Sequence, residues 1–226
     1  DEFASTYIER GWQADQAAWK AIAHVSSSDD VALVEHVVQQ LLEPWTNDSA
    51  RAFQAAVAHH PTPHHGNADL VEVAEHECLL FADGLRYDLA EALRDQLESL
   101  GCRVNLGHRW SALPSVTATA KPAVTPVAND IAGATLPADF TPTIQASEKP
   151  ANAPNLRSAM KEGGYQVLAG GMDDWPVSDT ARGWTEEGKI DTRGHQLQSE
   201  LPNTLADEVN RLAERIVKLL DAGWAG

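Results

Sequence analysis

The segment that most constrains the fold is ECLLFADGLRYDLAEALRDQLESLGCRVNLGH, residues 77–108, because a strand-length apolar run stands directly before a helical pattern. The run ECLLFAD lacks polar alternation, which is typical of a parallel strand buried on both faces. An amphipathic helix follows, with Gly101 at its expected C-cap, and CRVNLGH is a second candidate strand. Strand, helix and strand form a βαβ unit, so the sequence predicts an α/β fold with a mostly parallel sheet flanked by helices.

Residues 1–58 carry helical patterns throughout. A first helix is predicted in STYIERGWQADQAAWKAIAHV and a third in DSARAFQAAVAHH. The second, DDVALVEHVVQQLLEPW, is predicted to end at Pro44 and to turn six apolar residues inward: Leu33, Val34, Val37, Val38, Leu41 and Leu42. We therefore expect a helical N-terminal subdomain at residues 1–70 and an α/β domain at residues 71–226.

Three further segments complete the expected organisation. HHPTPHHGN predicts a solvated loop, since a mobile loop does not hold its four histidines in a metal-binding geometry. The Pro- and Ala-rich residues 125–156 are expected to form a long excursion or lid over the sheet edge. A strand at Tyr165–Leu168 and a long amphipathic helix in TLADEVNRLAERIVKLLDAGW follow. An α/β fold requires another strand after that helix, so the domain is expected to continue beyond Gly226.

The net charge of −16, from 33 acidic and 17 basic residues, argues against a broad basic groove for nucleic acid, because phosphate contacts need clustered Lys and Arg. The negative net charge is compatible with a phosphate substrate that is held through metal ions, because the ions supply local positive charge. The two cysteines, Cys78 and Cys102, stand in apolar surroundings and indicate core thiols of a reduced, cytoplasmic protein. No apolar run reaches the roughly 18 residues of a membrane span, so no membrane partner is expected.

Asp83 ends the apolar strand and is the first candidate for a residue of the functional site. In open α/β sheets ligands bind beyond the carboxyl ends of the strands, so this carboxylate is placed to hold a metal ion or a polar substrate. Gly84 allows a sharp turn. Arg86 opposes the dipole of the helix that follows, which points to phosphate binding or to an ion pair. The alternative is that Asp83 only caps the helix.

LPSVTATAKP supplies the second candidate, a hydroxyl at a helix N-terminus. Backbone N–H groups and a metal ion could make Thr117 a phosphoryl nucleophile, with Ser115 and Thr119 as rivals. The alternative is that Ser115 or Thr117 is the N-cap. Lys121 follows Thr117 by four residues, on the same helix face, and could meet an anionic substrate or only water.

IDTRGHQ supplies the third candidate, because Asp191 and His195 are four residues apart and could converge on one metal ion as carboxylate and imidazole. An acidic residue four positions before a histidine also arises by chance in a chain this acidic. The order of the three candidates along the chain therefore matters more than any one of them.

Taken in order, these stretches resemble the PglZ family of the alkaline-phosphatase superfamily. LLFADGLRYDLAEAL is similar to the family's strand–Asp–x–Leu–Arg–Tyr–acid–helix motif, ALPSVTATAKPAV to its nucleophile segment, and GKIDTRGHQ to its Asp-x-x-Gly-His metal motif. AGW after a long helix resembles the lead-in to the next metal-binding strand, and YIERGWQADQAAWK the region before the core. The resemblance covers most of the chain and implies an alkaline-phosphatase-like sheet.

The resemblance also implies a metal-dependent phosphatase or phosphodiesterase that uses two divalent ions, most often zinc in this superfamily. Asp83 and Thr117 would hold one ion, and Asp191 and His195 the other, with Thr117 as the catalytic nucleophile. The protein would act in a bacterial BREX antiphage defence system, beside a DNA methyltransferase and other defence proteins.

Arg86 and Lys121, by their charge and position, are expected to bind the substrate, a phosphate ester for which nucleic acid or nucleotide is the expected class. One departure concerns the end of the chain. The superfamily needs an Asp-His pair in a Thr/Ser-Asp-His-Gly strand and commonly a further His, and the sequence stops at DAGWAG, where that strand should begin. Half of each metal shell would then be missing, which predicts weak metal binding and no activity for this chain alone.

Two other functions compete with this one. The missing ligands and the acidic composition favour a non-catalytic interaction module that uses the PglZ fold to hold partners of the defence complex. A phosphomutase-like enzyme acting on small phosphosugars would share the superfamily chemistry.

Overall fold

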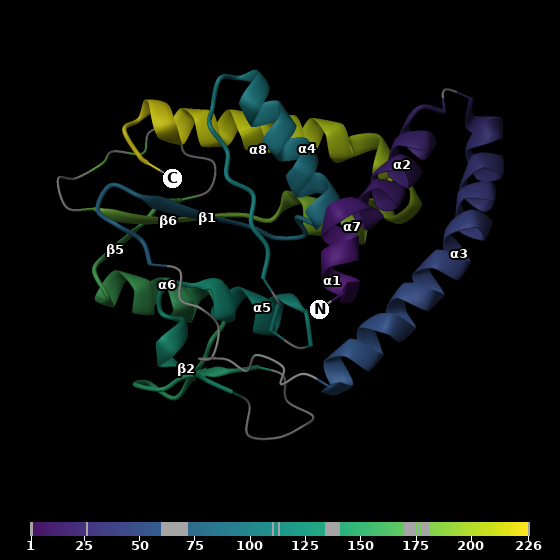
Figure 1. The fold of residues 1–226 in the computed structure, drawn as a ribbon. Helices are drawn as coiled ribbons and strands as arrows, with labels where there is room; N and C mark the ends of the chain where they lie inside the picture. Colours follow the sequence, from purple (N-terminus) through teal and green to yellow (C-terminus); the bar gives the residue numbers. More distant parts are fainter. Residues whose placement is uncertain are drawn as a thin grey trace. The chain divides into compact units, whose positions relative to one another are not determined.

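The computed structural model describes residues 2–25, 27–59, 72–109, 111–112, 114–133, 141–169, 175, 177 and 181–225. The chain divides into two compact units. Unit 1 comprises Asp1–Pro61, Gly84–Leu106 and Gly188–Glu214, and unit 2 comprises Thr62–Asp83, Gly107–Glu187 and Arg215–Gly226. The α/β class is confirmed: helices come first, and a small parallel sheet packed with helices and a small antiparallel sheet follow (Figure 1). The predicted boundary at residue 70 and most of the HHPTPHHGN segment lie outside the described residues.

Unit 1 is built from helices. It contains α1 (Glu2–Thr6), a π-helical turn η1 (Tyr7–Gly11), α2 (Trp12–Ala23), α3 (Ser28–His59), α4 (Tyr87–Ser99), α7 (Lys189–Leu197), the short η3 (Gln198–Glu200) and the start of α8 (Pro202–Asp221). The helix α2 packs against both α3 and α4, and Trp19 of α2 is buried. The C-cap of α4 is Leu100, and Gly101, which the sequence favoured for the cap, follows it in the left-handed conformation, with a φ of 86° and its N–H bonded to the carbonyl of Glu98.

The second and third predicted helices form one continuous helix, α3, with Pro44 inside it. A proline lacks an N–H and costs one helical hydrogen bond, which is why a break was expected. Packing explains the continuity: the ring of Trp45 lies within 3.4 Å of the position that a Cβ on Gly11 would take, so the residue after the proline is held against η1. Six apolar residues of this helix were predicted to face inward, and the prediction is wrong for half of them. Val34, Val38 and Leu42 are half-buried, whereas Leu33, Val37 and Leu41 are exposed.

The parallel sheet of unit 2 has the order β1–β6–β5, with β1 at Cys78–Ala82, β6 at Arg182–Glu187 and β5 at Tyr165–Val167. Residue pairs run in register from Cys78 opposite Gly183 to Ala82 opposite Glu187. The strands predicted at 77–83 and 165–168 are confirmed in place. The strand predicted at residues 102–108 is wrong: its residues alternate between half-buried and exposed, but the ladder beside β1 is made by β6 instead.

Both faces of this sheet are covered. On one face Leu156 and Met160 of α6 (Ala153–Glu162) pack with Trp184, and on the other Leu219 of α8 packs with Leu168 and a tryptophan pair, Trp175 and Trp224. The apolar run of β1 therefore meets side chains on both faces, as its sequence predicted. Its five residues are nevertheless only half-buried, because β1 is a terminal strand of the sheet as described.

The segment expected to form a lid is part of the core in its described portion, residues 125–133 and 141–156. It holds the short η2 (Ala128–Asp130) and the antiparallel strands β2 (Ile131–Ala132), β3 (Thr143–Ile144) and β4 (Lys149–Pro150). Ile131 and Ile144 are buried in the same cluster as Trp184. Burying these apolar side chains stabilises the segment against the sheet rather than over its edge.

Beyond α8 the chain returns to β1. Ala225 forms an isolated parallel bridge with Glu77, accepts a hydrogen bond from the N–H of Cys78 at 2.9 Å and donates one to the carbonyl of His76 at 2.7 Å. These bonds lie on the side of β1 that faces away from β6, since alternate residues of a parallel strand bond to opposite neighbours. The last described residues of the chain therefore lie beside β1.

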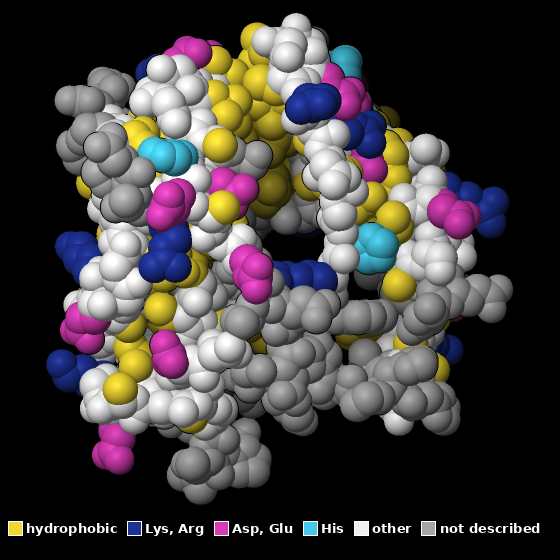
Figure 2. Space-filling model, turned by 60° about the vertical axis from the view of Figure 1, so that its left-hand side comes forward, with side chains coloured by type: hydrophobic (Ala, Val, Ile, Leu, Met, Phe, Trp, Pro, Cys, Tyr) yellow, Lys and Arg dark blue, Asp and Glu magenta, His cyan; other side chains and the backbone are white. Residues whose placement is uncertain are grey.

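None of the described helices has both the length and the apolar character needed to cross a bilayer. Among the described residues on the face shown in Figure 2, Lys and Arg side chains are interspersed with acidic ones and form no continuous basic patch.

Candidate functional site

Asp83 lies at the carboxyl end of β1, where the sequence placed it. Its N–H donates to the carbonyl of Glu187 at 2.7 Å, which continues the ladder between β1 and β6 by one more bond. The next residue, Gly84, has a φ of 79°, a conformation that L side chains rarely adopt. Asp83 is not the cap of α4, because Arg86 occupies the N-cap position and makes no side-chain capping bond. The capping alternative for Asp83 is therefore wrong.

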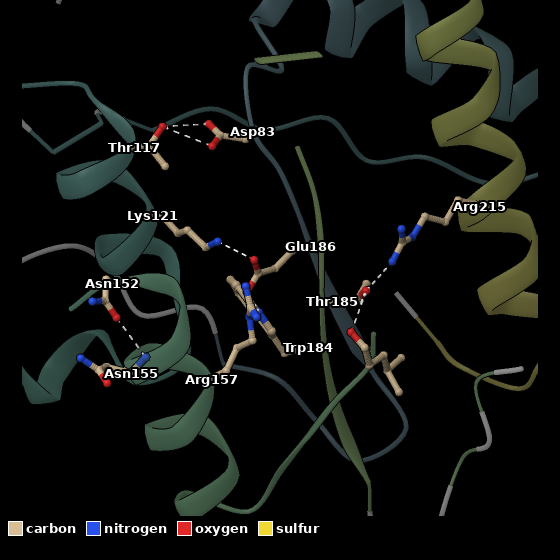
Figure 3. Close-up of polar contacts among 11 residues, drawn as sticks. Asp83, Thr117, Lys121, Asn152, Asn155, Arg157, Trp184, Thr185, Glu186 and Arg215 are labelled. Atoms are coloured by element: carbon tan, nitrogen blue, oxygen red, sulfur yellow. Dashed lines mark hydrogen bonds and ion pairs between the residues drawn. The ribbon is translucent and has the colours of Figure 1, made fainter. Parts of the chain in front are cut away.

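Thr117 faces Asp83 within unit 2, as Figure 3 shows. Its hydroxyl lies 3.3 Å from Oδ1 and 3.2 Å from Oδ2 of Asp83, across 34 residues of sequence. Thr117 is the first residue of α5 (Thr117–Val124), and Val116, not Thr117 or Ser115, is the N-cap. The hydroxyl of Thr117 is exposed and points at a half-buried carboxylate, an arrangement that can orient it for attack on a ligand.

The structure separates the three candidate hydroxyls. Thr119 is buried, and its hydroxyl donates to the backbone carbonyls of Pro114 and Val116, the latter at 3.0 Å. Its hydroxyl is thus used to hold the first turn of α5. Ser115 is exposed and precedes the helix. Of the three, Thr117 is the one that contacts Asp83.

Lys121 lies one turn after Thr117 and is nearly buried. Its Nζ is 2.5 Å from Oε2 of Glu186 and lies 5.3 Å from the centre of the Phe81 ring. Oε1 of the same glutamate accepts hydrogen bonds from Nε of Arg157 at 3.1 Å and from Nε1 of Trp184 at 3.0 Å. The predicted substrate contact of Lys121 would therefore have to compete with Glu186.

Burial by itself raises the pKa of Glu186, but the hydrogen bonds from Lys121, Trp184 and Arg157 outweigh it, so the pKa of this carboxyl lies below its ordinary value. The carboxylate form is thereby favoured in the folded protein. Because the folded pKa is lowered, the stability gained from this group is present at neutral pH and is lost as the pH falls through that folded pKa.

The neighbouring carboxylate, Glu187, faces the opposite side of the sheet. Nη1 of Arg215 in α8 lies 3.1 Å from Oε2 of Glu187, and Nη2 donates to the hydroxyl of Thr185 at 2.6 Å. Glu187 and Arg215 are both nearly buried, and the guanidinium of Arg215 lies 5.4 Å from the Trp175 ring. Two adjacent acids of β6 are thus neutralised from opposite faces, as the alternation of a strand requires. Figure 3 shows Lys121 and Glu186 on one side of β6 and Thr185 and Arg215 on the other.

In unit 1, Arg86 forms the ion pair that was one of its two predicted roles. Its Nε and Nη2 donate to Oδ1 and Oδ2 of Asp88 at 3.0 and 2.7 Å. Asp88 is fully buried and also accepts a bond from Nε1 of Trp19 at 3.1 Å. The guanidinium fork is therefore occupied by a carboxylate, although the side chain of Arg86 stays 55% exposed.

Asp191 and His195 meet on α7 of unit 1, with Oδ1 of Asp191 3.7 Å from Nε2 of His195. Both side chains are open to solvent, the histidine strongly so. The pair presents a carboxylate and an imidazole, ligand types that divalent transition metals favour.

Each predicted ligand pair is assembled, the first in unit 2 and the second in unit 1. Each offers two donors, whereas a zinc site commonly uses three or four protein ligands. Across the part of the chain that the structure describes, no group of three or more His, Cys, Asp and Glu side chains could hold a metal ion. The donor types fit a divalent ion, and the number of donors in each pair is half a tetrahedral shell.

Sequence reasoning missed Glu186, Glu187 and their cations Arg157 and Arg215. The signal that could have found them is the segment RGWTEEG, in which two acids stand before a glycine at a strand end. Polar residues at the carboxyl ends of parallel strands gather at one edge, beside Asp83 in this sheet.

Comparisons of the chain with protein-family models, with curated proteins and with solved structures found no match. The geometry of the described residues therefore carries the argument on function.

Proposed function

We propose that this chain contributes the nucleophile and part of the metal shell of a metal-dependent phosphoric-ester hydrolase, a phosphatase or phosphodiesterase of PglZ type that serves a bacterial BREX antiphage system. The observation that carries the proposal is the hydroxyl of Thr117 on the carboxylate of Asp83, at the carboxyl end of a parallel strand. In α/β folds this is the edge at which ligands bind.

In the proposed reaction Asp83 orients the hydroxyl of Thr117 by accepting its hydrogen bond. The threonine oxygen attacks phosphorus in line with the leaving oxygen, a phosphorus–oxygen bond to Thr117 forms, and the ester bond to the leaving group breaks. The hydroxyl proton passes to the carboxylate of Asp83 and from there to the leaving oxygen. Water then cleaves the phosphothreonine, which releases phosphate or a phosphomonoester and restores the hydroxyl. The burial of Thr119 and the hydrogen bond between Thr117 and Asp83 support Thr117 over the other two hydroxyls as the proposed nucleophile.

Divalent ions, zinc in the first instance, would supply positive charge to the phosphoryl oxygens when bound. Asp83 and Thr117 would hold one, and Asp191 and His195 the other, each together with further donors. Arg86 and Lys121 are proposed to favour an anionic substrate, nucleic acid or nucleotide, mainly through their charge, because Asp88 and Glu186 already accept their hydrogen bonds.

We expect a protein that contains this chain together with the further metal ligands to hydrolyse bis-p-nitrophenyl phosphate in the presence of Zn²⁺. Thr117→Ala and Asp83→Ala should each lower kcat/KM at least about 100-fold, since the first removes the nucleophile and the second the group that orients it. Release of p-nitrophenolate, followed by absorbance, measures the rate.

The matched control is Ser115→Ala, which removes an exposed hydroxyl two residues from Thr117 and should leave the rate within a factor of about 2. Unchanged hydrolysis in both the Thr117 and the Asp83 variant would refute the proposed nucleophile.

For the 226-residue chain alone we expect weak zinc binding, with a Kd above about 10 μM by titration calorimetry, because each described pair supplies two donors. Asp191→Asn should weaken that binding further. Tight binding of two ions by this chain would contradict the incomplete metal shell.

A further inference from the structure

One line of large apolar side chains on α3 is exposed among the residues that the structure describes. Leu33, Val37 and Leu41 are 62%, 48% and 73% exposed. They follow one another at four-residue spacing, so they lie along a single side of the helix over about 12 Å. We call this line the α3 stripe. The neighbouring residues Val34, Val38 and Leu42 are half-buried on the side where α3 contacts α1 and α2.

Single exposed apolar residues are ordinary on protein surfaces. Three exposed apolar residues in one line can form a binding surface, because a helix of similar length can cover all of them at once with its own i, i+4 and i+7 residues. The stripe is therefore shaped for a helix rather than for a small molecule, and its length corresponds to about two helical turns.

The charged residues of α3 from its start to residue 50 are all acidic, and Arg51 is the first cation after them. Residues 28–50 contain five acids, Asp29, Asp30, Glu35, Glu43 and Asp48, and neither Lys nor Arg. Asp30 precedes Leu33 by three residues and Asp48 follows Leu41 by seven, so both lie close to the line of the stripe, and both are exposed. An apolar strip with an acid at each end selects a partner with basic ends.

We propose that the α3 stripe is the docking face for a basic amphipathic helix of another protein. The partner helix places apolar residues on Leu33, Val37 and Leu41 and Lys or Arg side chains near Asp30 and Asp48. A second copy of this chain would bring five more acids to the same place, and an anionic membrane surface would be repelled by them.

The test uses the 226-residue chain and a fluorescein-labelled synthetic helix with Leu at i, i+4 and i+7 spacing and Lys at the other positions. Two further peptides serve as probes: one of the same composition in scrambled order, without an apolar face, and one with Glu in place of Lys. Fluorescence anisotropy measures Kd. The Lys/Leu helix should bind at least about 10-fold more tightly than either of the others.

The double variant Leu33→Gln, Leu41→Gln should weaken binding of the Lys/Leu helix at least about 10-fold, because it removes the two most exposed apolar contacts. The matched control is Leu100→Gln, Leu220→Gln, which changes two exposed leucines outside the stripe and should leave Kd within a factor of about 2. Asp30→Asn, Asp48→Asn should weaken binding about 3-fold at low salt and less at high salt.

Circular dichroism establishes that all variants stay helical. Equal binding of the scrambled peptide, or an equal loss in the control variant, would show attraction by charge alone and overturn the proposal. A concentration-dependent dimer in sedimentation that the stripe variant dissolves would also overturn it, since the occupant would then be a second copy.

Discussion

Trp184→Ala is expected to lower the free energy of unfolding by about 3–5 kcal/mol, the range for large aromatic residues removed from a core. Trp184 is fully buried in the central strand β6. Its ring lies 6.2 Å from that of Phe81, stacked at 15°, and packs with Leu156 and Met160 of α6. Alanine would leave a cavity between the sheet and α6 and would also free Oε1 of Glu186 from one of its donors.

Urea denaturation followed by circular dichroism measures this loss. Trp184→Phe keeps a ring in the core and removes the N–H, so it should cost less, about 1–2 kcal/mol. Leu100→Ala, at an exposed position, serves as the control and should stay within about 0.5 kcal/mol of the parent. Equal stability of Trp184→Ala and Leu100→Ala would mean that the β6 core does not hold this chain together.

Glu187→Ala is the second change with a large expected effect, again about 3–5 kcal/mol, because it leaves a buried guanidinium without its carboxylate. Arg215 would retain the hydroxyl of Thr185 and the ring of Trp175. Its Nε is already buried without a hydrogen-bond partner among the described residues, so little is left to compensate the charge.

The cost of an unpaired buried charge also predicts that stability returns when both Glu187 and Arg215 are replaced. Glu187→Leu together with Arg215→Met should bring stability back to within about 1 kcal/mol of the parent or above it, because no buried charge remains. Glu162→Ala, an exposed acid at the end of α6, is the single-site control. If the double variant is as unstable as Glu187→Ala, the loss comes from packing and not from the unpaired charge.

Local patterns in the sequence predicted most of the regular elements. The apolar run at Cys78–Ala82 became β1, the periodic segment after it became α4, and TATAKPAV became α5. Asp83 and Thr117 were chosen because each stands at the end of such an element, and the ends of elements follow from local residue types. The alternatives at those two positions, a capping carboxylate and a capping hydroxyl, were decided only by the structure.

The sequence did not predict the central strand β6, because two of its six residues are glutamates, which are rarely buried without a partner. Their partners come from far along the chain: Lys121 is 65 residues from Glu186, Arg157 is 29, and Arg215 is 28 residues from Glu187. No local pattern records such pairings.

The sequence by itself thus determined that α4, α5 and α8 are helices, where the first strand of this protein lies and which strand end carries a carboxylate, because periodicity and turn residues act over a few positions. Tertiary structure alone decided that Thr117 meets Asp83, that β6 is central and that Leu33, Val37 and Leu41 face solvent. Those outcomes depend on which distant side chains neutralise a charge or cover an apolar face, and that is settled only when the chain packs.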